Sequence, residues 1–288
     1  MGGWAGGAGR WVALPKQTTR GLVLDLGNAA AKDERMIRLF HISDLHFGLE
    51  DRRALDWVVQ ALRDERPDGL VITGDFTMRA RPREFAAAAR WIAGLDVPVR
   101  IDPGNHDLPY FNPIERMIDP YRRFRELEAS VARPLVLPGL AIVRLPTTAA
   151  AQWRFNWSRG IAGSRALRHA LAELDAIPLG TPVIVTCHHP LVEVGTHGKA
   201  LTKGGNLALA ELAKRGVLAV LSGHVHDAFD LEQQTPAGLV RMIGAGTLSQ
   251  RLRTTPPTFN DLTFQGGRLT CRLRKLEGVD DSAFGHYR

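Results

Sequence analysis

Short apolar segments alternate with amphipathic helical segments along most of the chain, and this alternation is the feature that most limits its fold. From Met36 onward, residues 37–43 and 69–74 are typical of buried strands, while residues 52–65 between them carry apolar side chains at helical spacing. The second half repeats the pattern and then becomes strand-rich over residues 228–276. The pattern predicts an α/β (α+β) fold with two mixed β-sheets packed together and helices outside, a four-layer αββα sandwich.

The chain has 288 residues, which is enough for one large domain with a substantial core. We interpret residues 36–275 as this domain, residues 1–35 as a flexible N-terminal tail and residues 276–288 as a C-terminal tail. The first 35 residues are rich in glycine, and Asp25 interrupts their most apolar part. They therefore lack the uninterrupted apolar region of a signal peptide.

Composition restricts the cellular setting and the partners. No stretch approaches the roughly 20 apolar residues that span a bilayer, so we expect no membrane insertion. Cys187 and Cys271 form neither a CxxC pair nor a disulfide framework, which favours a cytoplasmic location. The formal net charge is +7, but no compact Lys/Arg block stands out, so the charge is weak support for an anionic ligand. The sequence indicates no oligomeric state.

Five predicted strands end in short polar loops whose side chains are suited to metal binding. Six of the ten histidines lie in these loops. In chain order the polar residues are Asp44 and His46, then Asp75, then Asn105, His106 and Asp107, then His188 and His189, and finally His224 and His226. Because ligands of α/β sheets bind beyond the carboxyl ends of the strands, we expect the loops to converge on one site.

Each loop by itself has an ordinary structural explanation. Asp44 and His46 are compatible with a turn whose aspartate caps the next helix, and Gly-Asn in the "GNHD" run is common in turns. The alternation of His224 and His226 also fits a half-buried strand. The occurrence of all five loops in one chain favours a metal site over packing alone.

The residue types indicate which metals the site would bind. Carboxylate, imidazole and amide ligands suit Mn²⁺, Fe²⁺/Fe³⁺ or Zn²⁺ rather than an all-oxygen Ca²⁺ site. The loops also offer more ligands than one ion needs. Two ions about 3.5–4 Å apart, joined by a carboxylate, are a known arrangement for phosphoryl hydrolysis. We therefore expect a binuclear centre at the carboxyl ends of the strands.

The ordered motifs D-x-H, GD, GNHD, HHP and GHVH, from Asp44 to His226, resemble the signature of the calcineurin-like metallophosphoesterase superfamily. The resemblance covers nearly all of residues 36–275. The opening "HISDLHF", residues 41–47, is similar to the branch of cyclic-nucleotide and glycerophosphodiester phosphodiesterases. The resemblance implies a two-sheet sandwich and a metal-dependent phosphoric ester hydrolase.

The resemblance also implies a role for each motif residue. The first metal would be bound by Asp44, His46 and His226, the second by Asn105, His188 and His224, and both by Asp75. His188 is preferred to His189 because the family places this ligand two residues before the proline.

Two further residues would serve the substrate rather than the metals, according to the same resemblance. His106 would stabilise the phosphate and protonate the leaving oxygen, with Asp107 as its orienting partner. A metal-bound hydroxide would attack phosphorus in line.

The sequence thus predicts a binuclear metal-dependent phosphodiesterase acting on a small phosphodiester, with a cyclic nucleotide as the first substrate to consider. A phosphomonoesterase, a protein phosphatase, a lipid-A-precursor pyrophosphatase and a nuclease stay open as alternatives of the same fold. The +7 charge favours the nuclease and nucleic acid as partner, whereas no DNA-binding or coiled-coil region follows the domain. A non-catalytic binding module would be expected to lack some ligands, and none is missing.

Overall fold

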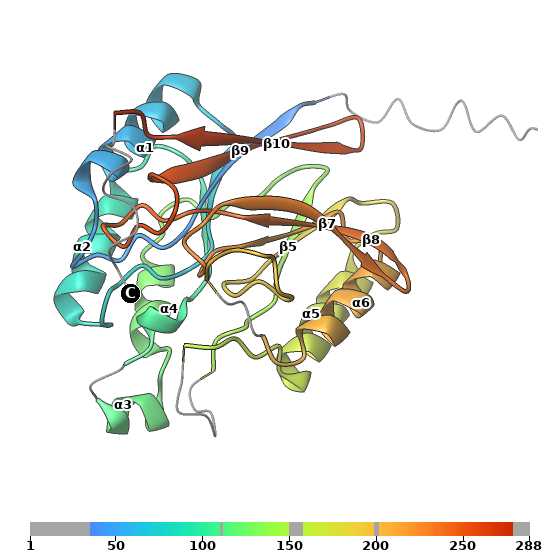
Figure 1. Cartoon of the computed structure of the whole chain (residues 1–288), viewed down its shortest axis with the longest axis horizontal. Coiled ribbons are helices and arrows are strands. Elements are labelled where there is room, and N and C mark those ends of the chain that lie inside the picture. Colours follow the sequence, from blue (N-terminus) through green and yellow to red (C-terminus); the bar gives the residue numbers. More distant parts are fainter. Residues whose placement is uncertain (1–34, 110–111, 150–157, 199–201, 279–288) are drawn as a thin grey trace, which may run out of the picture. The chain divides into compact units, whose positions relative to one another are not determined.

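Two five-stranded β-sheets form the centre of the described part of the chain, which in this computed structural model comprises residues 35–109, 112–149, 158–198 and 202–278 (Figure 1). These residues belong to one unit, Arg35–Arg288. The predicted tails lie almost entirely outside the described residues, so the division into domain and tails stays a prediction.

The first sheet has the strand order β10-β9-β1-β2-β3. Its members are β1 (Ile37–Ile42), β2 (Gly69–Ile72), β3 (Val99–Ile101), β9 (Thr258–Gln265) and β10 (Arg268–Lys275). β1, β2 and β3 are parallel, and β9 and β10 form an antiparallel hairpin that pairs with β1. The sheet is therefore mixed, as predicted.

The second sheet has the order β4-β5-β6-β8-β7. Its members are β4 (Ala141–Arg144), β5 (Val183–Thr186), β6 (Ala219–Ser222), β7 (Phe229–Thr235) and β8 (Gly238–Gly244). β4, β5, β6 and β8 are parallel, and β7 pairs with β8 in the antiparallel sense. The five strands that precede the polar loops, β1, β2, β3, β5 and β6, all belong to the parallel parts of the sheets.

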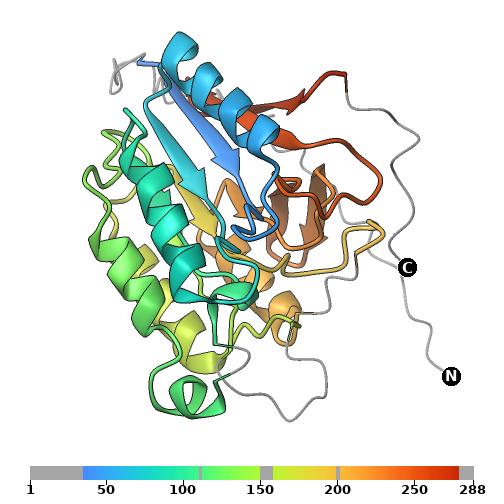
Figure 2. The same ribbon diagram turned by 90° about the vertical axis from the view of Figure 1, so that its left-hand side faces the viewer.

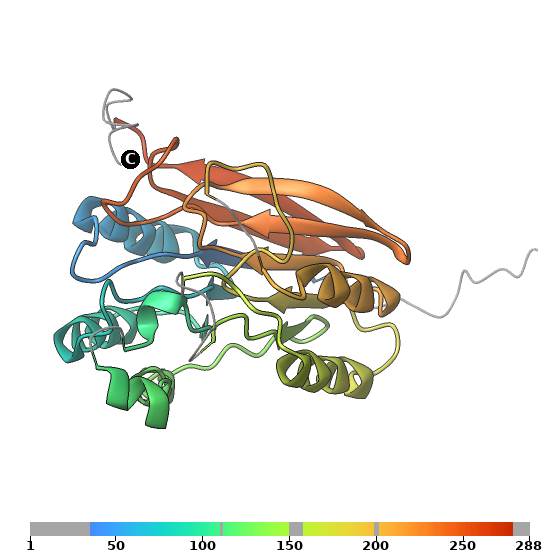
Figure 3. The ribbon, with the colours of Figure 1, turned by 60° about the horizontal axis from the view of Figure 1, so that its bottom comes forward.

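Helices cover the outer faces of the two sheets (Figures 2 and 3). Apolar side chains of three helices pack against the first sheet, and those of two helices pack against the second. The helices on the first sheet are α1 (Arg52–Glu65), α2 (Pro82–Ala93) and α4 (Arg122–Ala129), and those on the second are α5 (Ser164–Ala176) and α6 (Gly205–Lys214). Among the described residues, no helix combines the length and the apolar character that crossing a membrane requires.

Two short elements connect the first sheet to the second. The 3₁₀-helix η1 (Asn105–Asp107) follows β3, and α3 (Pro113–Ile118) precedes α4. The chain leaves the helical conformation at Asp119 and Pro120, since α4 does not begin until Arg122. Proline disfavours the helical conformation of the residue before it, which explains the break.

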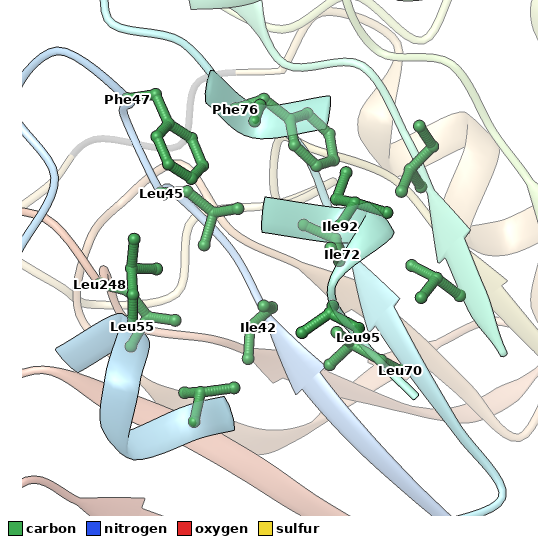
Figure 4. Close-up of a cluster of buried hydrophobic side chains, with 14 of the residues drawn as sticks. Ile42, Leu45, Phe47, Leu55, Leu70, Ile72, Phe76, Ile92, Leu95 and Leu248 are labelled. Atoms are coloured by element: carbon green, nitrogen blue, oxygen red, sulfur yellow. The ribbon is translucent and has the colours of Figure 1, made fainter. Parts of the chain in front are cut away.

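The strands bury side chains on both faces, and this produces the four layers. In β1, Leu39 faces the apolar layer between the sheets, where it joins Ile184 and Ile243 of the second sheet. The next residue, Phe40, faces the helices. The helix side of β1 and β2 is shown in Figure 4, where Ile42 and its neighbours pack against the helices. The predicted sandwich of two mixed sheets flanked by helices is confirmed.

Hydrogen bonds join the carboxyl ends of the parallel strands across the two sheets. Thr247, beyond β8, pairs with Ser43, beyond β1, in an isolated parallel bridge. The backbone N–H of His224, beyond β6, donates to Asp44 Oδ2 at 2.8 Å. The loops of both sheets therefore meet at one edge of the sandwich.

Candidate metal centre

The loops at this edge contain an unusual number of left-handed backbone conformations. Among the described residues, seven non-glycine residues have a positive φ, and five of them are candidate ligands: Asp44 (56°), His46 (47°), Asp75 (55°), His224 (71°) and His226 (63°). Such conformations are uncommon for residues other than glycine, and they concentrate at functional sites, where surrounding packing holds them. These bends turn the side chains toward a common point directly after each strand.

Two motif glycines allow the loops to approach closely. A Cβ atom on Gly104 would lie 2.1 Å from both the backbone nitrogen and Oδ1 of Asp75. A Cβ atom on Gly223 would lie 1.8 Å from Ser43 Oγ. The "GNHD" and "GHVH" motifs therefore need glycine at their first position, because any side chain would displace a neighbouring loop that carries a candidate ligand.

Asp44, His46 and His226 form the first cluster of candidate ligands. Asp44 Oδ1 lies 3.2 Å from His226 Nε2 and 3.6 Å from His46 Nε2, and the two Nε2 atoms are 3.2 Å apart. All three side chains are buried. Asp44 Oδ1 receives no hydrogen bond from the described part of the chain. The cluster thus directs three ligand atoms at one small volume.

Asp75 lies between this cluster and a second one. Its Oδ2 atom is 3.7 Å from His46 Nε2 and 3.4 Å from His188 Nε2. His188 Nε2 is also 3.1 Å from Asn105 Oδ1. The other carboxylate oxygen, Oδ1, accepts a 2.8 Å hydrogen bond from the backbone N–H of His106, which fixes the direction of Oδ2. The carboxylate of Asp75 therefore has the placement that a bridging ligand needs.

His224 completes the second cluster. Its ring centroid lies 5.2 Å from that of His188, and its ligand atom lies within 4.8 Å of one on His188. The structure thus brings together all seven residues that the resemblance implies as ligands.

Backbone carbonyls orient the histidine rings of the two clusters. The Nδ1 atoms of three rings face carbonyl oxygens: His188 faces Thr73 at 2.7 Å, His226 faces Arg251 at 2.8 Å and His46 faces Thr77 at 3.4 Å. An imidazole that donates from Nδ1 to a carbonyl leaves its Nε2 lone pair available. In each ring this lone pair points into the clusters, which is the arrangement found in metal-binding histidines.

The charges and pKa shifts of the two clusters favour a bound cation. Burial acts to raise the pKa of Asp44, but the imidazoles of His226 and His46 hold that pKa well below its usual range. Burial lowers the pKa of His46 to about 4, so this ring is neutral. Burial also acts to lower the pKa of His188, but the Asp75 carboxylate outweighs it and raises that pKa to about 9. Buried carboxylates need a compensating positive charge, and an ion bound here takes the place of the proton.

His189 lies within reach of His188 and His224, but both of its ring nitrogens are engaged elsewhere. Its Nδ1 lies 3.0 Å from Thr147 Oγ1, and its Nε2 lies 2.8 Å from the carbonyl oxygen of Ser158. Burial lowers the pKa of the ring to about 3. His189 therefore holds the loop at Ser158, and the geometry favours His188 as the ligand of this pair.

The structure corrects the expected partnership of His106 and Asp107. The His106 ring donates from Nδ1 to the carbonyl oxygen of Met78 at 2.7 Å, and its Nε2 faces the cavity above the clusters. The Asp107 carboxylate instead accepts backbone N–H bonds at 2.9 Å from both Thr77 and Gly104. The prediction that Asp107 orients His106 is wrong, because its oxygens are occupied in fixing the two neighbouring loops.

A cavity of about 260 Å³ opens above the clusters. Asp75, His106 and His224 line this cavity, and so does Arg251 from the loop after β8. No sequence motif predicted a role for Arg251. A signal was present, because "RLRTTPP" follows the last parallel strand, where the strand-end rule places ligand-binding residues.

Comparison with known proteins agrees with this geometry. The sequence model of the calcineurin-like phosphoesterase family matches residues 37–228, which span all five motif loops. The chain belongs to this family. The predicted family is therefore confirmed, and with it a metal-dependent phosphoester hydrolase class whose members use a binuclear centre.

One curated relative is similar over a shorter region. Glycerophosphodiester phosphodiesterase GpdQ from Enterobacter lignolyticus (strain SCF1) is 32% identical over 93 residues, which are 26% of this chain and 33% of the relative. The match thus spans a third of the relative's length.

Solved structures share the fold at low sequence identity. Purple acid phosphatase PPD1 from yellow lupin (Lupinus luteus) seeds has a TM-score of 0.60 at 14% identity, covering 84% of this chain and 52% of that chain. GAP50, the anchor in the inner membrane complex of Plasmodium, has a TM-score of 0.53 at 12% identity, covering 86% of this chain and 92% of that chain. At these identities the likeness concerns the fold alone.

Proposed function

We propose that the chain is a binuclear metal-dependent phosphodiesterase that hydrolyses a small organic phosphodiester. One ion would be held by Asp44, His46 and His226, the other by Asn105, His188 and His224, and both by Asp75. Mn²⁺, iron and Zn²⁺ are the ions that this mixture of carboxylate, imidazole and amide ligands suits. A cytoplasmic location stays a prediction.

The observation that carries the proposal is the position of Asp75. Its Oδ2 atom lies 3.7 Å from His46 Nε2 of one cluster and 3.4 Å from His188 Nε2 of the other. A pair of bound ions supplies Lewis-acid activation of water and of the phosphoryl oxygens. The protein supplies the geometry, since the carbonyls behind the histidines fix each Nε2 lone pair.

His106 is suited to protonate the leaving oxygen. Its Nδ1–H donates to Met78, and its ring lies at right angles to that of His46, with centroids 4.8 Å apart. Nε2 therefore faces the cavity in which the substrate would lie. A positioned general acid of this kind contributes about 10²- to 10⁴-fold to the rate when the leaving group is a poor one.

The size of the cavity and the named relative support a small diester. The cavity of about 260 Å³ is slightly smaller than most ligand pockets, which measure about 300–1,000 Å³. The relative that is 32% identical is a glycerophosphodiester phosphodiesterase. Cyclic nucleotides and glycerophosphodiesters are therefore the first substrates to test, with cAMP at the head of the panel.

The test is hydrolysis of a chromogenic diester, cAMP, glycerophosphodiesters, a phosphomonoester and single-stranded DNA by the protein loaded with Mn²⁺, Fe²⁺ or Zn²⁺. We expect the small diesters to be cleaved fastest, and Asp75→Ala to abolish the activity. Preference for the monoester or for DNA would replace the proposal by phosphatase or nuclease activity. Equal inertness of wild type and Asp75→Ala with every metal would refute an enzymatic role.

A further inference from the structure

The guanidinium of Arg251 reaches into the site from the loop after β8. Its Nη1 atom lies 3.1 Å from His106 Nε2 and 3.4 Å from His46 Nε2. Arg251 thus contacts both the residue proposed to protonate the leaving oxygen and a candidate ligand of the first metal. It lies 145 positions from His106 in the chain, and its side chain is partly buried.

The backbone of this loop is anchored to the first cluster, so the position of Arg251 is determined by the fold. The Arg251 carbonyl oxygen faces His226 Nδ1 at 2.8 Å. The backbone N–H of Leu248 and the hydroxyl of Thr247 both donate to the carbonyl oxygen of Asp44, at 3.3 Å and 2.8 Å. The loop that presents the guanidinium therefore also holds two residues of the first cluster.

No carboxylate in the described part of the chain forms an ion pair with Arg251. Several partly buried arginines of this protein bind carboxylates, such as Arg38 with Asp261 and Arg144 with Asp102. Within the ranges that the structure describes, no carboxylate oxygen lies within the 4.0 Å ion-pair distance of Arg251. Its positive charge is thus directed at the cavity instead.

The walls of the cavity strengthen the positive field around Arg251. Arg159 and Arg253 also line the cavity, whereas Asp75 is the single carboxylate among its described lining residues. Since Asp75 belongs to the candidate metal centre, no acidic side chain is left among the other described lining residues. Such a cavity favours an anion next to the metals.

We propose that Arg251 is a catalytic residue that donates hydrogen bonds to the non-bridging oxygens of the phosphoryl group under attack. The inference deepens the proposed function and rests on it. The planar guanidinium fork matches two oxygens of one phosphoryl group, and a charge-assisted pair of this kind is stronger than a neutral hydrogen bond. Arg251 would thereby hold the phosphoryl group against the metals while His106 faces the leaving oxygen.

Three variants test this role in the metal-loaded full-length protein. Arg251→Gln removes the charge, Arg251→Lys keeps the charge but loses the fork, and Arg268→Gln removes a charge from an exposed position at the start of β10. For each, the measurements are kcat/KM for the chromogenic diester, the affinity for inorganic phosphate by calorimetry, and the number of metal ions per chain.

We expect Arg251→Gln to lower kcat/KM by about 10²- to 10³-fold, as loss of one donor to a charged transition state does elsewhere. Its phosphate affinity should fall by about 10- to 100-fold, the loss that one charge-assisted hydrogen bond implies. Arg251→Lys should recover part of both losses, and metal content should equal that of the wild type and Arg268→Gln.

Unchanged phosphate affinity in Arg251→Gln, at wild-type metal content, would overturn the inference. Loss of metal from this variant would also overturn it, because Arg251 would then support the ligands rather than the substrate. Phosphate binding does not require turnover of a diester. If the wild type cleaved no diester, the proposed function would fail while the contribution of Arg251 to anion binding could still be measured.

Discussion

His46 and His226 direct their Nε2 atoms at each other across 3.2 Å, although they are 180 positions apart in the chain. Both rings have Nδ1 opposite a backbone carbonyl oxygen, and a neutral imidazole that donates from Nδ1 has an acceptor at Nε2. Two acceptors that face each other in a buried site repel unless a positive charge lies between them. The carboxylate of Asp44, at 3.2 Å from His226 Nε2, adds a negative charge at the same point.

The bridging position of Asp75 predicts that one substitution affects both ions. Asp75→Asn keeps the shape of the side chain but removes the charge that two cations share. We expect metal content to fall from about two ions per chain to one or none, and kcat/KM to fall by at least about 10²-fold. Metal analysis together with kinetics would check this. A fully active Asp75→Asn protein with two ions would rule out the bridge.

The role of His106 predicts a dependence on the leaving group. An alkoxide leaving group such as that of cAMP needs a proton, whereas p-nitrophenolate leaves without one. In His106→Asn we expect kcat for cAMP to fall by about 10²- to 10⁴-fold and kcat for the p-nitrophenyl diester to fall much less. The exposed His197, as His197→Asn, is the matched control. Equal losses with the two substrates would contradict proton donation.

Metal removal should destabilise the fold. Five candidate ligands have left-handed conformations, and each costs on the order of 1–3 kcal/mol unless its surroundings hold it. An ion that binds the folded state at 100 times its Kd adds about 2.7 kcal/mol. We expect a chelator to lower Tm and added Mn²⁺ to raise it in a concentration-dependent way in calorimetry. A Tm that does not respond to either would argue against a metal centre built from these residues.

We predict that the Asp107 carboxylate stabilises the folded protein. Its carboxylate accepts the N–H groups of Thr77 and Gly104, and in Asp107→Asn the amide NH₂ would face one of these donors. Leaving such a buried group unpaired costs about 1–3 kcal/mol, which urea unfolding can measure. Asp56→Asn, at an exposed position of α1, should change stability much less. A stable Asp107→Asn variant would contradict this assignment.

A network of side chains across β1, β9 and β10 predicts a pH dependence of stability. Burial acts to raise the pKa of Asp261, but hydrogen bonds from Arg38 and Arg272 outweigh it and lower that pKa. A folded-state pKa below the unfolded one, about 3.9, gives stabilisation that is present above that pH and lost as pH falls through the folded pKa. We expect Asp261→Asn to lower stability by about 1–3 kcal/mol at pH 7 and the difference to shrink as pH falls below the unfolded pKa of about 3.9. If the stability difference between the wild type and Asp261→Asn grew as pH fell, the folded-state pKa of Asp261 would be raised rather than lowered.

Much of the fold could be predicted because the sequence follows simple periodicity. The apolar spacing in residues 52–65 predicted a helix, and α1 spans Arg52–Glu65. The ligands that the resemblance assigned could be found because each lies directly after an apolar strand. The sharp left-handed turns at positions such as Asp44 and His226 were not predictable, since they depend on packing between the two sheets.

Contacts made by single side chains across the sandwich could not be predicted from the sequence. Arg251 follows β8 of the second sheet and His106 follows β3 of the first, so their contact depends on how the two sheets pack, and no motif marks it. Asp107 follows His106 directly, which suggested a pair, but a 3₁₀ turn directs their side chains to different partners. Chain proximity predicted a contact there, whereas the backbone conformation decided it.

Anomalous diffraction from crystals grown with Mn²⁺ tests whether these residues bind two ions. We expect two anomalous peaks about 3.5–4 Å apart, with the Asp75 carboxylate touching both. One peak should be bound by Asp44, His46 and His226, and the other by Asn105, His188 and His224. A single peak, or a peak bound by His189 in place of His188, would contradict the proposed metal centre.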